Sequence, residues 1–213
     1  SMIVYGSSFS PYVRKTLAFI SEKGLETEVV AIAPNSEDAA FRAASPLGKI
    51  PGFRDGDFAI SDSTAIITYL EAKHPTPEML PSEPAERART VWFEEFADTV
   101  LIACMAKVFF NRFVAPRFLN RAGDEAVAEK AHKEELPPLL DYLESVVPAS
   151  GHLVADRLTL ADLAIASPFV NLAHVGIEAN ATSHPRLAGF LAAVHARPSF
   201  APLIASEKAF AGR

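Results

Sequence analysis

The chain has 213 residues, of which 49% are hydrophobic and 22% charged, the balance of an ordinary globular protein long enough to bury a core. Its net charge of −6 argues against a nucleic-acid-binding surface, because phosphate binding needs an excess of Lys and Arg. A single cysteine excludes an internal disulfide, and the six histidines lack metal-binding spacing, so no metal is expected. The longest apolar run in the middle of the chain, residues 100–106, is too short to cross a bilayer. Residues 2–6 resemble a strand and not a signal segment, so a cytoplasmic protein is expected.

The first part of the chain alternates between strand and helix patterns. β-Branched and aromatic residues predict strands over residues 2–6, 28–32, 52–54 and 58–60, the last two joined by the turn pair Asp55-Gly56. Helices are predicted over residues 11–24, 36–44 and 63–74. Ser10 and Pro11 suit the start of the first helix and Gly24 its end, and its charged residues Arg14 and Lys15 are expected at the surface. The order βαβ, α, ββα resembles the thioredoxin-like fold.

Four prolines at positions 75, 77, 81 and 84 predict a linker. Beyond it the patterns are helical only. They predict helices over residues 85–114, ending before Pro116, over 124–147, kinked at Pro137-Pro138, over 160–174, and shorter ones within 184–210. The expected architecture is therefore an α/β thioredoxin-like domain over residues 1–76, a linker over 77–85, and an all-helical domain over 86–213.

The segment Ser10-Pro11-Tyr12-Val13, at the start of the first predicted helix, is the first chemical signal. It resembles the glutaredoxin redox motif Cys-Pro-Tyr-Cys with both cysteines replaced, so a dithiol mechanism is excluded. What remains is a hydroxyl donor at a helix N-terminus, where backbone N–H groups and the helix dipole favour an anion. The alternative is that Ser10 is an ordinary N-cap.

The segment Gly48-Lys49-Ile50-Pro51, just before a predicted strand, is the second signal. It resembles the stretch before the cis-proline of thioredoxin-like proteins. A cis bond would expose the backbone N–H and C=O of Ile50, which could pair with the backbone of a peptide ligand. The alternative is an ordinary trans-proline that enters an edge strand.

The third signal is Ile60-Ser61-Asp62-Ser63-Thr64-Ala65-Ile66, followed by Tyr69-Leu70. Ser63 at a helix N-terminus suits a carboxylate, and Asp62 can accept hydrogen bonds from an ammonium group. The alternative is simple N-capping by Asp62.

Together the three signals resemble, in order and spacing, the glutathione transferases. The third is similar to the family's stretch (Glu/Gln)-Ser-x-Ala-Ile-x-x-Tyr-Leu, with Asp62 in place of the commoner Glu or Gln. The resemblance continues in Leu158-Thr159-Leu160-Ala161-Asp162, interpreted as a structural capping box, and in segments 184–187 and 196–200. It thus covers nearly the whole chain and implies an enzyme that uses glutathione as cosubstrate.

The resemblance implies that Ser10 holds the glutathione thiolate by donating a hydrogen bond. A free thiol has a pKa of about 8.5, and one charge-assisted hydrogen bond with a helix end can lower it by about one to two units. Glutathione is expected to bind through its cysteinyl backbone at Ile50, its γ-glutamyl end at Asp62 and Ser63, and its glycine carboxylate at Lys49. The alternative for Lys49 is a solvated loop lysine. The implied glutathione-binding residues are Lys49, Ile50, Pro51, Asp62 and Ser63.

The second substrate is expected to be a small hydrophobic electrophile, and the family resemblance implies a homodimer. The candidates for the electrophile pocket are Phe9, Tyr12, Met105, Val108, Phe109 and Arg112. Those on the long helix form a stripe at helical spacing, which is more often part of a core. Cys104 is expected to be a buried small hydrophobe.

Three other functions are weighed against this transferase. The segment Ser7-Ser8-Phe9-Ser10 loosely resembles that of the zeta class, the maleylacetoacetate isomerases, in which Ser7 or Ser8 would be the donor. Ser10 is preferred because it directly precedes Pro11, which resembles the Ser-Pro-Phe stretch of plant tau-class and many bacterial members. A non-catalytic binding module is disfavoured by the intact set of glutathione signals. Thiol transfer or dehydroascorbate reduction would need a cysteine at position 10.

Overall fold

The computed structural model describes residues 1–212. The chain divides into two compact units, one formed by residues 1–79 with the segment from Arg197 onward, the other by Leu80–Ala196. The sequence assigned residues 86–213 to one helical domain, whereas in the structure the segment after Ala196 packs with the first unit.

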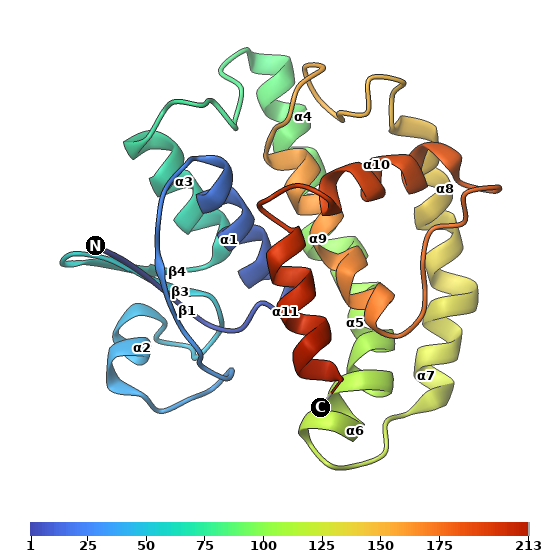
Figure 1. Cartoon of the computed structure of the whole chain (residues 1–213), viewed down its shortest axis with the longest axis horizontal. Coiled ribbons are helices and arrows are strands. Elements are labelled where there is room, and N and C mark those ends of the chain that lie inside the picture. The colour runs from blue at the N-terminus through green and yellow to red at the C-terminus, as the bar shows by residue number, and fades with distance from the viewer. Residues whose placement is uncertain (213) are drawn as a thin grey trace. The chain divides into compact units, whose positions relative to one another are not determined.

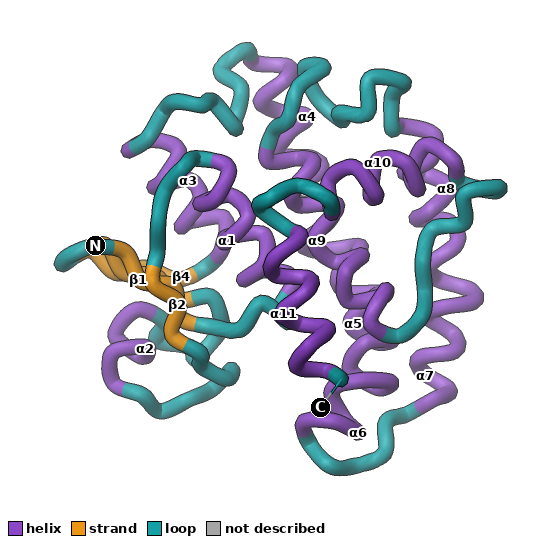
Figure 2. Tube along the Cα trace, in the orientation of Figure 1, coloured by secondary structure: helices purple, strands orange, loops and turns teal. Residues whose placement is uncertain are grey.

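The first unit is a four-stranded sheet with helices on both faces (Figures 1 and 2). The strand order is β2-β1-β3-β4, with β1 parallel to β2 and antiparallel to β3, and β3 antiparallel to β4. Helices α1 and α3 pack together on one face and α2 lies on the other. The elements are β1 (Met2–Tyr5), α1 (Pro11–Glu22), β2 (Glu28–Val30), α2 (Ala39–Ala44), β3 (Gly52–Asp55), β4 (Phe58–Ser61), α3 (Ser63–Lys73) and α11 (Ala201–Ala211).

Side chains of β1 point alternately to the two faces of the sheet, and buried residues pack on both faces. Tyr5 packs against Phe41 of α2, with ring centroids 6.2 Å apart, while its neighbour Val4 is fully buried because successive strand residues point to opposite faces. The expected βαβ, α, ββα order is confirmed. The strand at 28–32 and the helix at 36–44 are shorter than predicted, the latter because Asp38 caps it by accepting from the N–H of Phe41.

Arg14 and Lys15 correct the expectation that they lie at the surface of α1. They are 0% and 1% exposed. The Arg14 Nε donates to Oε2 of Glu207 on α11 at 3.1 Å, and Nη2 donates to Oε1 of the same carboxylate. A buried charge is tolerated only when it is paired and hydrogen-bonded, and Glu207 supplies that partner 193 residues further along the chain.

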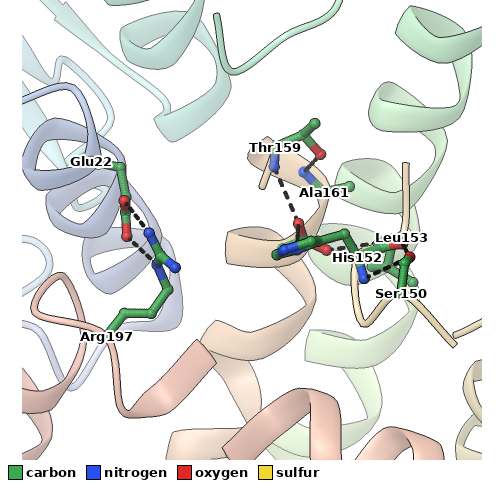
Figure 3. A network of polar contacts seen from close by, with 8 residues as sticks. Glu22, Ser150, His152, Leu153, Thr159, Ala161 and Arg197 are labelled. Atoms are coloured by element: carbon green, nitrogen blue, oxygen red, sulfur yellow. Dashed lines mark hydrogen bonds and ion pairs between the residues drawn. The ribbon is translucent and has the colours of Figure 1, made fainter. Parts of the chain in front are cut away.

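The second unit is helical throughout. Its central helix α9 is buried at every position from Leu160 to Leu172 and packs against α4, α5 and α10. The predicted capping box is confirmed, since Thr159 and Asp162 bond reciprocally at the start of α9. Figure 3 shows Thr159 and its bond to Ala161 at this helix start. The elements are α4 (Pro84–Glu95), η1 (Phe96–Leu101), α5 (Ile102–Phe109), η2 (Phe110–Val114), α6 (Ala115–Phe118), α7 (Glu125–Lys130), η3 (Ala131–Glu135), α8 (Leu136–Val146), α9 (Leu160–His174) and α10 (Pro185–His195).

The expectation that the long helix ends before Pro116 is wrong. The helix runs unbroken from Pro84 to Phe118, and the residue four before Pro116, Arg112, lies in the π-helical segment η2. A proline ring clashes with the carbonyl four residues earlier in a regular α-helix, and a π-type turn displaces that carbonyl. Pro137 and Pro138 lie in the first turn of α8, directly after the π-helical segment η3. The carbonyls four residues before them lie in that π-type segment, so the helix accommodates these two prolines in the same way.

This continuous helix is long and apolar enough to cross a membrane by length and composition alone. No uninterrupted apolar run marks it in the sequence, because single charged residues divide its apolar stretches. Of its most apolar window, 44% is buried within the protein, and core helices pass the same test. Cys104 on α5 is 6% exposed, as expected, and burial raises the pKa of its thiol, which makes it a poor nucleophile.

Candidate functional site

The pairing of the strands brings the three predicted signals to one edge of the sheet. Tyr5, the last residue of β1, pairs with Gly52, the first of β3, and Gly52 pairs with Ser61, the last of β4. The loop to Ser10, the segment ending at Pro51, and the turn into α3 therefore leave or enter the sheet at the same end.

Gly6 shows how closely two of these segments approach. Its φ is +148°, and a Cβ built there would lie 2.7 Å from Val13 Cγ2 and 3.2 Å from Ile50 Cβ. Only a glycine allows the loop after β1, the first turn of α1 and the segment before β3 to meet this closely.

Ser10 is the N-cap of α1, and its hydroxyl can also serve a ligand. Its Oγ accepts from the N–H of Val13 at 3.3 Å, its φ and ψ of −75° and 126° are extended, and Pro11 follows it. A serine hydroxyl has two acceptor lone pairs and one donor proton, so the capping bond leaves the proton available. The two interpretations of Ser10 are therefore compatible.

The Ile50–Pro51 bond is cis, as the thioredoxin-like resemblance suggested. Strand pairing begins only at Gly52, so Ile50 precedes the ladder. The carbonyl of Lys49 accepts from the Ser45 hydroxyl at 2.6 Å, which fixes this loop, while the Lys49 side chain is exposed.

Asp62 has a positive φ of 80° with ψ of 123°, although it carries a side chain. Such backbone conformations cost of order 1–3 kcal/mol and gather at functional sites. Its Oδ1 accepts from the N–H of Ala65 at 3.0 Å, so it does cap α3. Asp62 is exposed, whereas Ser63 is 4% exposed, so a ligand can reach only a small part of Ser63.

The electrophile-pocket candidates have different environments. Phe9 and Tyr12, in the first unit, are partly exposed, and Phe9 meets Phe210 of α11 edge-on at 5.8 Å. Met105, Val108 and Phe109, in the second unit, are buried, the position expected of core residues.

Arg112 belongs to a charged cluster in the second unit. Its guanidinium bonds Glu125 at 2.8 Å and Glu129 at 3.0 Å, and approaches Nδ1 of His132 at 3.2 Å. Burial, helped by the nearby Lys133 and Arg112 cations, lowers the pKa of His132, which suits a neutral imidazole that accepts from Arg112. These contacts give Arg112 a structural role.

Two residues that contact the neighbours of Ser10 could not be predicted from the sequence. Glu207 and Phe210 on α11 contact Arg14 and Phe9, and no local pattern connects segments nearly two hundred residues apart. Among residues 1–212, no three His, Cys, Asp or Glu side chains cluster in a way that could hold a metal ion.

Comparison with known proteins identifies both parts of the chain. Residues 4–78 match the family model "Glutathione S-transferase, N-terminal domain", and residues 96–207 match "Glutathione S-transferase, C-terminal domain". Glutathione S-transferase 3 of Zea mays is 30% identical over 95% of this chain and 93% of its own length. A glutathione S-transferase of Hyoscyamus muticus is 29% identical over 95% and 97%.

Solved structures of glutathione S-transferases also superpose on this chain. A glutathione S-transferase from Rhodospirillum rubrum is 26% identical, covers 95% of this chain and 91% of its own, and superposes with a TM-score of 0.86. One from Methylobacterium radiotolerans, in complex with glutathione sulfonate, is 25% identical, covers 95% and 94%, and has a TM-score of 0.77. On the evidence of both family models and of these relatives, the chain belongs to the glutathione S-transferase family.

Proposed function

We propose that this protein is a glutathione transferase that activates glutathione as a thiolate for attack on an electrophilic small molecule, with Ser10 as the thiolate donor. The observation that carries the proposal is the Ser10 hydroxyl, which caps α1 through a lone pair and keeps its proton for a ligand. It lies at the sheet edge that Ile50 and Asp62 also flank. The names of the relatives support the transferase activity.

In the proposed reaction the glutathione thiol loses its proton to solvent. The Ser10 O–H and the N-terminus of α1 stabilise the resulting thiolate. The sulfur then attacks an electrophilic carbon, a C–S bond forms, and the leaving group departs with the electron pair of the broken bond. Ser10 donates a hydrogen bond throughout and does not need to ionise.

Glutathione is proposed to lie along the same edge. The backbone of Ile50, ahead of Pro51, would pair with the cysteinyl backbone. Asp62 would accept from the γ-glutamyl ammonium while Ser63 donates to its carboxylate, and the exposed Lys49 would pair with the glycine carboxylate. The φ of 80° at Asp62 supports a functional role for that residue.

The electrophile is proposed to contact Phe9 and Tyr12, whose side chains are partly exposed beside Ser10 in the chain. The burial of Met105, Val108 and Phe109 favours the core alternative for those three. A cytoplasmic homodimer with a role in detoxification is the setting that the family resemblance suggests.

The test is glutathione binding and turnover. The protein should be retained on immobilised glutathione and should turn over 1-chloro-2,4-dinitrobenzene. Calorimetry on Ser63→Ala should show clearly weaker glutathione binding, because the γ-glutamyl carboxylate loses a donor. Thr68→Ala is the matched control, since Thr68 is a hydroxyl residue of the same helix that bonds the carbonyl of Thr64. Unchanged affinity in Ser63→Ala would move the γ-glutamyl site elsewhere.

A further inference from the structure

Three contacts within the first unit join α11, or the residues just before it, to α1 or to the residue just before its N-cap. At one end, Arg197 and Ser199 just before α11 bond the carboxylate of Glu22, with distances of 2.8 and 2.6 Å (Figure 3 shows the Arg197 pair). In the middle, the Arg14–Glu207 pair is buried, with both side chains at 1% exposure or less. At the far end, Phe210 meets Phe9.

The second and third contacts involve Arg14 and Phe9, which are close to Ser10 along the chain. Arg14 is one helical turn after Ser10, and its N–H donates to the Ser10 carbonyl at 2.9 Å. Phe9 immediately precedes Ser10, in a turn closed by the Ser10 N–H and the Ser7 carbonyl at 2.9 Å. The buried ion pair therefore fixes α11 against the turn of α1 that carries the proposed thiolate donor.

Phe210 is 51% exposed although it sits on this fixed helix. Its ring makes a T-shaped contact with Phe9, with an interplanar angle of 62°. The rings of Phe9 and Phe210 meet at a steep angle, and the half-exposed Phe210 ring is open to a ligand. An aromatic ring of a substrate can pack against this pair by stacking or by edge contact.

We propose that Phe210 is a specificity-determining residue that, with Phe9, selects aromatic electrophiles, and that Glu207 is the positioning residue that holds it there through Arg14. This rests on the proposed function, because it takes Ser10 as the place where the sulfur is held. A small alkyl electrophile gains little from the aromatic pair, since it has no ring to pack against Phe9 and Phe210.

The test is a ratio of two efficiencies measured on one enzyme sample. With glutathione, 1-chloro-2,4-dinitrobenzene loses chloride from an aromatic carbon, and iodomethane loses iodide from a methyl carbon. In Phe210→Leu, kcat/KM for the aromatic substrate should fall about three- to tenfold, the scale of one lost aromatic contact, while that for iodomethane stays within about twofold. Glu207→Gln should shift the ratio in the same direction.

The ratio does not depend on the fraction of enzyme that is folded, so a merely structural role for Glu207 would leave it unchanged. Phe118→Leu, which alters a similarly exposed aromatic residue of the second unit, should also leave it unchanged. If Phe210→Leu keeps the wild-type ratio and turns over both substrates normally, the inference is overturned while the proposed function stands. Absence of glutathione-dependent turnover in the wild type would refute the proposed function, and the inference with it.

Discussion

Replacing Ser10 with alanine removes two interactions, and the free energy of each can be estimated separately. The first is the cap on Val13, worth about 1 kcal/mol of folding stability, which lowers Tm by roughly 2–4 °C in a chain of this size. The second is the hydrogen bond to the thiolate, worth about 1.5–3 kcal/mol. We therefore expect turnover to fall by about one to two orders of magnitude.

Glutathione affinity should stay nearly intact in Ser10→Ala, because the proposed binding contacts lie at Ile50, Asp62 and Ser63. The pKa of bound glutathione should rise by about one to two units. Calorimetry measures the affinity, steady-state turnover of 1-chloro-2,4-dinitrobenzene measures the activity, and the ultraviolet absorbance of the thiolate against pH measures the pKa.

Two further variants separate the roles of the serine. Ser10→Asp keeps an equally good N-cap but places a carboxylate beside the sulfur, so stability should be retained and turnover lost. Ser8→Ala should do little. If Ser8→Ala abolishes turnover while Ser10→Ala does not, Ser10 is only an N-cap and the zeta-type alignment is the right one.

Asp62→Asn should weaken glutathione binding about three- to fivefold by calorimetry, because it removes the charge that meets the ammonium and keeps the cap; Asp124→Asn, a capping residue of the second unit, is the control and should bind normally. Burial alone would raise the pKa of Glu22, but hydrogen bonds from Arg197 and Ser199 lower it below the ordinary 4.5, so this carboxylate stabilises the fold at neutral pH and loses that effect as acid protonates it. Glu22→Gln should therefore have a lower Tm at neutral pH and a shallower loss of Tm on acidification, and parallel curves for the two proteins would contradict the assignment. Light scattering at micromolar concentration should give twice the 23.0 kDa chain mass, and a 23.0 kDa species would contradict the homodimer.

Much of the fold follows from short-range signals. Ser10 with Pro11 and Thr159 with Asp162 are local capping patterns, and helices begin at both places. The end of the long helix could not be predicted in the same way, because the rule that proline stops a helix assumes α-helical hydrogen bonding in the preceding turn. At Pro116 that turn is π-helical, and no residue type marks such a turn in the sequence.

The residues of the candidate site also differ in whether a local sequence pattern marks them. Ser10, Ile50 and Asp62 could be proposed because each lies within a few residues of a recognisable turn or cap. Glu207 and Phe210 could not, since only tertiary packing brings them to α1. The burial of Arg14 was missed for the same reason: a guanidinium is expected in solvent until its carboxylate partner is known.

The assignment of the last helix to the first unit has a consequence for synthesis on the ribosome. Residues 80–196 can complete their own contacts while the C-terminal segment is still being made, whereas the unit that begins the chain must wait for Glu207 before the Arg14 charge can be buried in an ion pair. We therefore expect the second unit to fold before the first, the reverse of the usual order in which the N-terminal part folds first during translation. A fragment that stops after residue 79 should be poorly folded, and a separate peptide carrying α11 should restore it.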